Sequence, residues 1–104
     1  RNIVAETTKR GNVDRALKLT ERETDLDQRS MDIAMISIQS SRDGHLDTAL
    51  RILDKVTYKD RKDNALRQIA PELAKKDMAA ALKLAEQISN EKLRKEVIGN
   101  LKSA

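Results

Sequence analysis

The stretch that decides the fold is GNVDRALKL at residues 11–19, because its pattern returns twice further along the chain. It recurs as GHLDTALRI at residues 44–52 and, in a more divergent form, as KDMAAALKL at residues 76–84. The Ala-Leu pairs that begin at positions 16, 49 and 81 are 33 and 32 residues apart. A period in this range is typical of helical repeats, in which each unit buries its apolar face only by stacking on its neighbours. The sequence therefore predicts about three helical repeats of 32–33 residues.

The composition indicates an all-α protein with a single domain over residues 1–104. Gly and Pro together number four, too few for the turns of an all-β domain. With one Tyr and no Phe or Trp, any core must be built from Leu, Ile, Val, Ala and Met. Because the chain begins at Arg1 rather than Met, we expect it to be a fragment of a longer array.

Two types of helix alternate in the prediction, and the first type begins at each copy of the repeated stretch. Asn12, His45 and Asp77 occupy the expected N-cap positions, for which Asn and Asp are well suited and His less so. Apolar residues then follow at i, i+3, i+4 and i+7, the spacing of one helix face. A second apolar stripe on these helices predicts that each is sandwiched between neighbours.

The second helix type is expected after short polar links, with Asp27, Asp60 and either Ser89 or Asn90 as N-caps. The repeat register places residues 4–5 in such a helix too, so the chain is expected to open and close inside helices of this type. Pro71 falls inside the helix that follows Asp60, where its ring removes one backbone donor. We interpret it as a local kink or helix end that sets the curvature between repeats.

The repeated segment resembles the start of the second helix of a tetratricopeptide repeat, which has a Gly-Asn or Gly-Asp step, a bulky residue, an acid and then a small Ala. The positions that fit are Gly11, Asn12, Val13, Asp14 and Ala16, then Gly44, Leu46, Asp47 and Ala49, and in the third copy Asp77, Met78 and Ala81. The period is shorter than the family's usual 34 residues. Ile33, Ala65 and Val97 replace an expected large aromatic residue. A HEAT-like α-solenoid is the structural alternative.

The resemblance implies a right-handed superhelical stack of αα-hairpins. Its concave groove would be lined by the helices that precede each Gly-Asn step, and it would hold an extended peptide or a partner helix.

The residue types of catalysis and metal binding are poorly represented. His45 is the only histidine and there is no cysteine, so a metal site or a catalytic triad lacks its usual partners. The acidic cluster at residues 21–27 lacks the central Gly and the distal Glu of a calcium loop. We therefore expect no catalytic residue, no cofactor and no metal, and we expect the chain not to be an enzyme.

Basic residues near the starts of the second-type helices are the candidate partner-binding residues. Three of them, Arg29, Arg61 and Arg94, occupy similar repeat positions and could form a ladder that grips carboxylates. The favoured interpretation is that they pair on the surface with Asp27 and Asp60, which would contribute little stability. The full candidate set is Arg29, Arg61, Lys62, Arg94 and Lys95.

The predicted function is a protein–protein interaction scaffold that binds a peptide or partner helix, with an acidic partner as one variant. Residues 1–52 are electrically neutral and residues 53–104 carry the whole net charge of +4, so a nucleic-acid-binding repeat is an alternative. A purely structural spacer is another. Self-association through the ends of the array is expected as well. No apolar run is long enough for a membrane span, and a cytoplasmic location is the expectation.

Overall fold

The computed structural model describes residues 13–103, and these form α-helices joined by short turns, with no strand among them. The predicted all-α class is therefore confirmed. The helices are α2 (Val13–Thr20), α3 (Leu26–Arg42), α4 (Leu46–Leu53), α5 (Lys59–Ala74), α6 (Met78–Ala85) and α7 (Glu91–Ser103). The expected cap at Asn12, and the expected helix around residues 4–5, lie outside the described residues.

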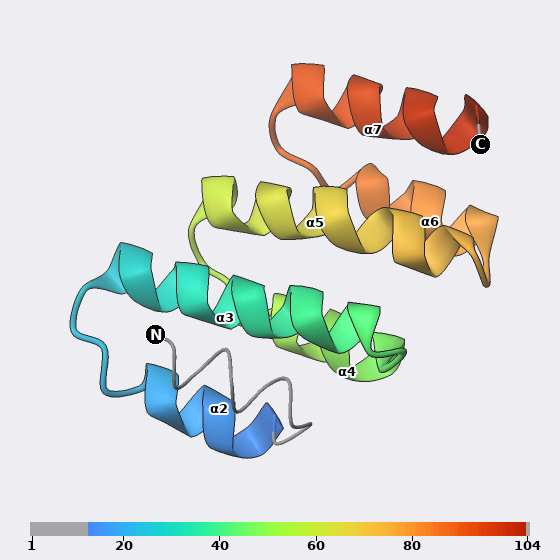
Figure 1. The fold of residues 1–104 in the computed structure, drawn as a ribbon. Coiled ribbons are helices and arrows are strands. Elements are labelled where there is room, and N and C mark those ends of the chain that lie inside the picture. The colour runs from blue at the N-terminus through green and yellow to red at the C-terminus, as the bar shows by residue number, and fades with distance from the viewer. Residues whose placement is uncertain (1–12, 104) are drawn as a thin grey trace.

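Long and short helices alternate along the chain. The long helices α3, α5 and α7 lie side by side and begin near the same edge of the molecule, with α4 and α6 behind them (Figure 1). Each helix packs on helices one or two places away in the sequence: α3 contacts α2, α4 and α5, and α5 contacts α3, α4, α6 and α7. The result is an elongated body of 39 × 25 × 18 Å. No helix within residues 13–103 is both long enough and apolar enough to cross a membrane.

The alanines of the repeated stretch are packing residues. Ala16, Ala49 and Ala81 are each 0% exposed, one on each short helix. A methyl group at these positions lets neighbouring helices approach closely, and branched aliphatic side chains fill the space around them. The largest fully buried apolar side chains are those of Ile36, Ile52, Leu66, Ile69 and Ile88. The core therefore needs no aromatic residue.

The turns after α3 and α5 are built differently. Gly44 has a φ of +89°, a left-handed conformation that glycine adopts without strain. There the His45 N–H donates to the Ser40 carbonyl at 2.9 Å and the Gly44 N–H donates to the Ser41 carbonyl at 3.2 Å, as in a Schellman C-cap. After α5, Lys76 replaces the glycine and no non-glycine residue in the described chain has positive φ. That turn closes instead through the Asp77 N–H, which donates to the Leu73 carbonyl at 2.8 Å.

Two of the predicted helix starts are wrong by two residues. The N-cap of α3 is Asp25 rather than Asp27, and Asp25 accepts a hydrogen bond from the Gln28 N–H at 3.0 Å. The N-cap of α5 is Tyr58 rather than Asp60, and it makes no side-chain cap hydrogen bond.

At the other starts the sequence was more informative. Asp77 caps α6 through a 3.0 Å bond from the Ala80 N–H, and Asn90 accepts from the Leu93 N–H at 2.9 Å at the start of α7. The Asp77 cap is confirmed, and of the two candidates Ser89 and Asn90 the structure selects Asn90. His45 stands at the N-cap of α4 but makes no side-chain cap hydrogen bond.

Candidate partner-binding groove

The five predicted basic residues lie in the N-terminal parts of α3, α5 and α7, along one edge of the molecule (Figure 1). Two of the arginines bind backbone rather than carboxylates. The Arg29 guanidinium donates to the carbonyls of Glu23 at 2.7 Å and Glu21 at 3.2 Å. The Arg94 guanidinium donates to the carbonyl of Ile88 at 3.0 Å. Each thus fixes the segment that precedes its own helix, and the predicted pairing with a carboxylate is wrong for both.

Arg61 is the one arginine of the three that pairs with a carboxylate as predicted. Its guanidinium donates two hydrogen bonds to Asp27, at 3.0 Å and 2.8 Å, and so joins α5 to α3. Hydrogen bonding to Arg61, helped by its positive charge, lowers the pKa of Asp27 below its ordinary value. Lys95 pairs with Glu91 at 3.1 Å on the surface of α7, and Lys62 is half-buried. The edge therefore presents no ladder of uniformly accessible arginines.

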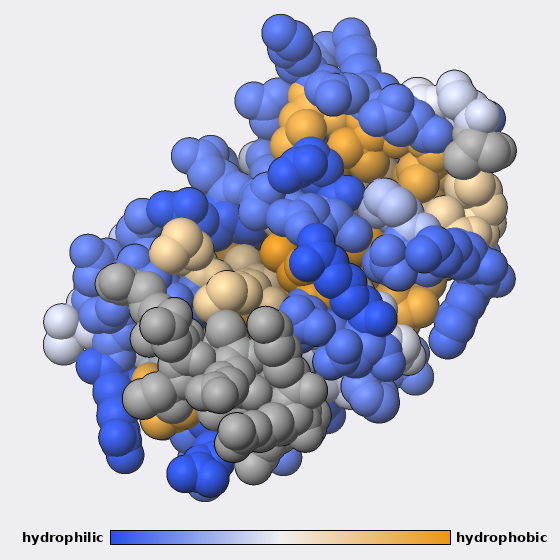
Figure 2. Space-filling view, in the orientation of Figure 1, coloured by the Kyte–Doolittle hydropathy of each residue, from blue (hydrophilic) through white to orange (hydrophobic). Residues whose placement is uncertain are grey.

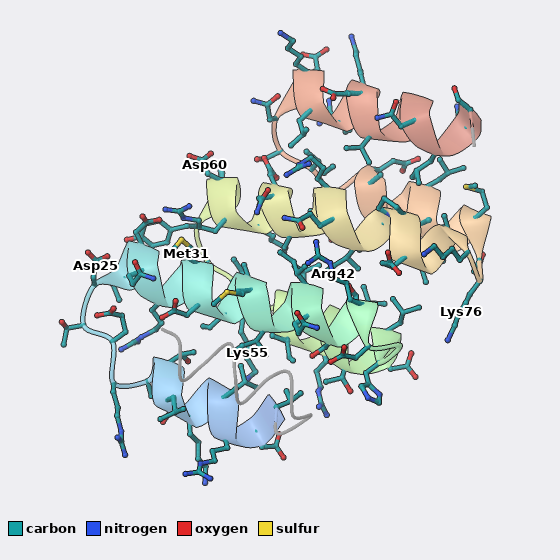
Figure 3. All side chains as sticks on the ribbon, viewed as in Figure 1. Asp25, Met31, Arg42, Lys55, Asp60 and Lys76 are labelled. Carbon is teal, nitrogen blue, oxygen red and sulfur yellow. The ribbon has the colours of Figure 1, made fainter. Side chains whose placement is uncertain are left out.

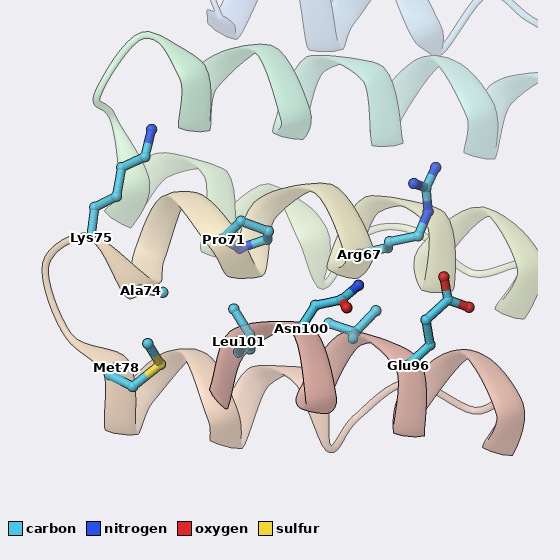
Figure 4. A pocket seen from close by; sticks show the side chains of 9 residues that line it. Arg67, Pro71, Ala74, Lys75, Met78, Glu96, Asn100 and Leu101 are labelled. Carbon is cyan, nitrogen blue, oxygen red and sulfur yellow. The ribbon is translucent and has the colours of Figure 1, made fainter. Parts of the chain in front are cut away.

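An apolar hollow lies elsewhere, between α5, α6 and α7 (Figure 4). Its volume is about 640 Å³. The apolar part of its lining comes from Pro71, Ala74, Met78, Val97 and Leu101, and its polar part comes from Arg67, Lys75, Glu96 and Asn100. In the space-filling view, apolar surface is open to solvent between α5 and α7 (Figure 2). None of the five predicted basic residues lines this hollow.

A second, polar hollow of about 260 Å³ continues the first toward the N-terminal ends of the same helices. Arg67 and Glu96 line both hollows, and Asp60, Asn64 and Lys92 belong to the polar one. The two hollows share these two lining residues and both lie along α5 and α7, and we call them together the α5–α7 groove. Its apolar half lies toward the C-terminal ends of these helices, so the groove has two chemically different ends.

The α5–α7 groove is open because the residues of α5 differ from those of α3 at matching positions. Counted from the N-cap of each helix, Pro71 of α5 corresponds to Ile38 of α3, which is buried. At the start of the following short helix, Met78 corresponds to Leu46. Leu46 is 7% exposed, whereas Met78 is 37% exposed. Ile38 and Leu46 are thus buried, whereas their counterparts Pro71 and Met78 are exposed and leave the space between α5, α6 and α7 open.

A polar bridge adds to the difference between the two helix pairs. Arg42 lies between α3 and α5 (Figure 3) and donates a hydrogen bond to Gln68 at 2.8 Å. The matching residues of α5 and α7 are Lys75 and Asn100, which both line the apolar hollow. Lys75 pairs instead with Glu72 of its own helix, at 3.3 Å. No bridge of the Arg42 kind therefore crosses the groove at this point.

A buried carboxylate joins α5 to the link that leads into α7. Asp63, which is 5% exposed, accepts hydrogen bonds from the Ser89 N–H at 2.8 Å, the Ser89 hydroxyl at 2.7 Å and the Asn90 N–H at 3.1 Å. Ser30 occupies the matching position of α3, where its hydroxyl lies 3.1 Å from that of Thr57. In both cases the residue on the long helix holds the link that leads into the next long helix.

The side chains that line the groove are of the kinds that bind a ligand. Its apolar walls can take up an aliphatic side chain, while the amide of Asn100 and the charges of Arg67, Lys75 and Glu96 stand at the rim, where they can orient a ligand. No group of three His, Asp or Glu side chains within residues 13–103 is arranged to hold a metal ion.

The sequence-based predictions missed the groove residues because they weighed charges rather than volumes. Of the two interpretations of Pro71, a helix end is wrong, because α5 continues through it to Ala74, and a kink stays a prediction; Pro71 is exposed on the groove wall. The signal that could have found the site is the change from Ile38 to Pro71 and from Arg42 to Lys75 at matching helix positions. Comparison of the chain with protein families, with curated proteins and with solved structures found no match in any of the three.

Proposed function

We propose that this chain is a protein–protein interaction scaffold that binds a peptide or helix of a partner in the α5–α7 groove. The observation that carries the proposal is the apolar hollow of about 640 Å³ between α5, α6 and α7. Its size is in the range of ligand-binding pockets, and its mixture of apolar walls and a few polar rim groups is typical of them. Met78 and Pro71 are exposed there, so a partner could bury apolar surface that now faces water.

We also propose that the fold is a divergent stack of αα-hairpins resembling tetratricopeptide repeats. Three observations support it: the buried alanine on each short helix, the side-by-side arrangement of α3, α5 and α7, and the matching roles of Ser30 and Asp63. In such a stack the groove lies on the face of the helices that precede each turn. This is the face on which the resemblance to the family places a bound peptide.

The test is a selection of peptides from a random library on the immobilised chain, followed by titration of the selected peptide into isotopically labelled protein. We expect amide resonances of α5 and α7 near Val97 and Leu101 to shift. The Ala74→Phe variant places a ring in the apolar hollow and should weaken binding at least tenfold. Ala79→Phe adds the same ring at an exposed position of α6 that does not line the groove, and serves as the matched control.

Two results would contradict the proposal. One is a selected peptide whose binding is equally strong for the Ala74→Phe and Ala79→Phe variants. The other is the absence of any peptide ligand together with RNA binding that falls steeply as salt is raised, which would indicate contacts to phosphates. Circular dichroism of both variants shows whether they keep the helical fold, so that loss of binding is not mistaken for unfolding.

A further inference from the structure

Of the three methionines, Met78 is the most exposed to solvent, at 37%, whereas Met31 and Met35 of α3 are half-buried. Met78 is the first residue of α6 and lines the apolar hollow, at the end where Ala74 and Lys75 lie (Figure 4). Neither of the other two methionines lines this hollow. Met78 is therefore the position at which a thioether sulfur, solvent and the α5–α7 groove come together.

The sulfur distinguishes this position from its counterpart in the earlier helix pair. Leu46 stands at the matching position and is 7% exposed. Leucine and methionine differ little in volume, so either side chain can form an apolar wall. Methionine alone can be converted by an oxidant into a polar side chain of nearly the same shape, and exposure to solvent makes that conversion easier.

We propose that Met78 is an oxidation site through which a hydroperoxide, such as hydrogen peroxide, lowers the affinity of the α5–α7 groove for apolar ligands. The thioether sulfur attacks one oxygen of the peroxide and forms an S–O bond while the O–O bond breaks. The sulfur is oxidised by two electrons to the sulfoxide, and hydrogen peroxide is reduced to water. Methionine sulfoxide reductases reverse the change. The inference rests on the proposed function, because it concerns ligand binding in the same groove.

The effect falls on binding rather than on the fold. Because Met78 is 37% exposed, water reaches the sulfoxide oxygen in the unliganded chain and hydrogen-bonds to it. An aliphatic side chain of a ligand displaces this water and leaves the polar oxygen against apolar atoms, which is unfavourable. The ammonium group of Lys75, at the same end of the hollow, is paired with Glu72. We therefore expect oxidation of Met78 to weaken the binding of an apolar peptide by about tenfold or more.

The experiment separates Met78 from the other two methionines with two variants of the full chain. The double variant Met31→Leu, Met35→Leu keeps only Met78, and Met78→Leu keeps only the methionines of α3. Each is treated with hydrogen peroxide and desalted, and mass spectrometry of proteolytic fragments measures the sulfoxide at each methionine. Calorimetry then measures the affinity for the peptide that was selected on the untreated chain.

Two results are expected. The oxidised double variant should bind the peptide at least tenfold more weakly than before treatment, and treatment with the two reductases, one for each sulfoxide epimer, should restore the affinity. Met78→Leu should bind equally well before and after treatment, even when both of its methionines are oxidised. Circular dichroism should show the same helical content in every sample, so that a loss of affinity is not mistaken for unfolding.

Three results overturn the proposal: an oxidised double variant that binds as it did before, an equal loss of affinity in Met78→Leu, or a Met78 that stays reduced while Met31 and Met35 of the wild type are oxidised. In each case the proposed function stands if the peptide still binds the untreated chain and Ala74→Phe still blocks it. If no peptide binds the groove of the untreated chain, the proposed function fails and this inference fails with it.

Discussion

The carboxylate of Asp63 provides a test of how the groove is built, because it joins the link between α6 and α7 to α5 through three hydrogen bonds. Hydrogen bonds to a charged group contribute about 1.5–3 kcal/mol each. Ser89 and Asn90 are exposed, so water replaces part of what is lost when the carboxylate is removed. We therefore expect Asp63→Ala to lower the free energy of unfolding by about 2 kcal/mol, nearer to one such bond than to three.

The Asn side chain has nearly the same shape as that of Asp. The Asp63→Asn variant therefore shows how much of the stability comes from the hydrogen bonds of Asp63 rather than from its packing. In one orientation its amide NH₂ faces the Ser89 N–H, and in the other it faces the Asn90 N–H, so one donor always meets another donor. We expect Asp63→Asn to lower the free energy of unfolding by about half as much as Asp63→Ala does. Asp60→Asn, at an exposed position on the same helix, is the control and should change stability by less than about 0.5 kcal/mol.

Urea denaturation and thermal melting measure the effect, and amide hydrogen exchange locates it. A loss of about 2 kcal/mol corresponds to a fall in Tm of roughly 8–16 °C for a chain of this size. Exchange should accelerate first in α7, because the link into this helix loses its hydrogen bonds to α5 while α3 and α4 are unaffected. A Tm for Asp63→Ala within about 2 °C of the wild type, or exchange that accelerates equally in α3 and α7, would refute this account of the groove.

Four further outcomes follow from the structure. Gly44→Ala forces a β-carbon into a φ of +89° and should lower the free energy of unfolding by about 1–2 kcal/mol in urea denaturation, whereas Gly99→Ala, within a helix, should not. Ile69→Ala removes a side chain that is 0% exposed and should cost about 2–5 kcal/mol by the same measurement. Arg61→Gln should raise the pKa of Asp27 toward its ordinary value in a carboxyl NMR titration, because Arg61 is what lowers it. Since that pKa is lowered in the folded chain, the stability it contributes is present above the ordinary pKa of Asp and is lost as pH falls through the lowered value; in Arg61→Gln this acid dependence should weaken.

Much of the fold could be predicted from residue patterns. The all-α class followed from the scarcity of Gly and Pro. The preference of Asp and Asn for caps gave Asp77, and it gave Asn90 as one of two candidates with Ser89. The same preference misled at α3, because Asp25 and Asp27 both suit a cap. Only the folded chain distinguishes them: Asp27 bonds Arg61 of another helix, which leaves Asp25 to accept the Gln28 N–H.

The changes from Ile38 to Pro71 and from Arg42 to Lys75 are visible in the sequence, but whether they open a groove depends on the volumes of side chains that meet across helices. The residues around Pro71 in the sequence do not show that its ring lines the same hollow as Leu101. Nor do they show that Lys75 pairs with Glu72 instead of reaching Asn100, as Arg42 reaches Gln68. The basic residues stood out in the sequence because charge is visible there. In the structure, Arg29 and Arg94 bind backbone carbonyls and hold the links before their helices.

The sequence by itself determined the helices, because helix formation depends on residues three and four positions apart and on the side chains at helix ends. It also determined which alanines lie in the core, through the return of the Ala-Leu pair every 32 or 33 residues. Tertiary structure alone decided where the surface is open. An opening depends on the difference in volume between side chains from α5, α6 and α7 that become neighbours only when the helices pack.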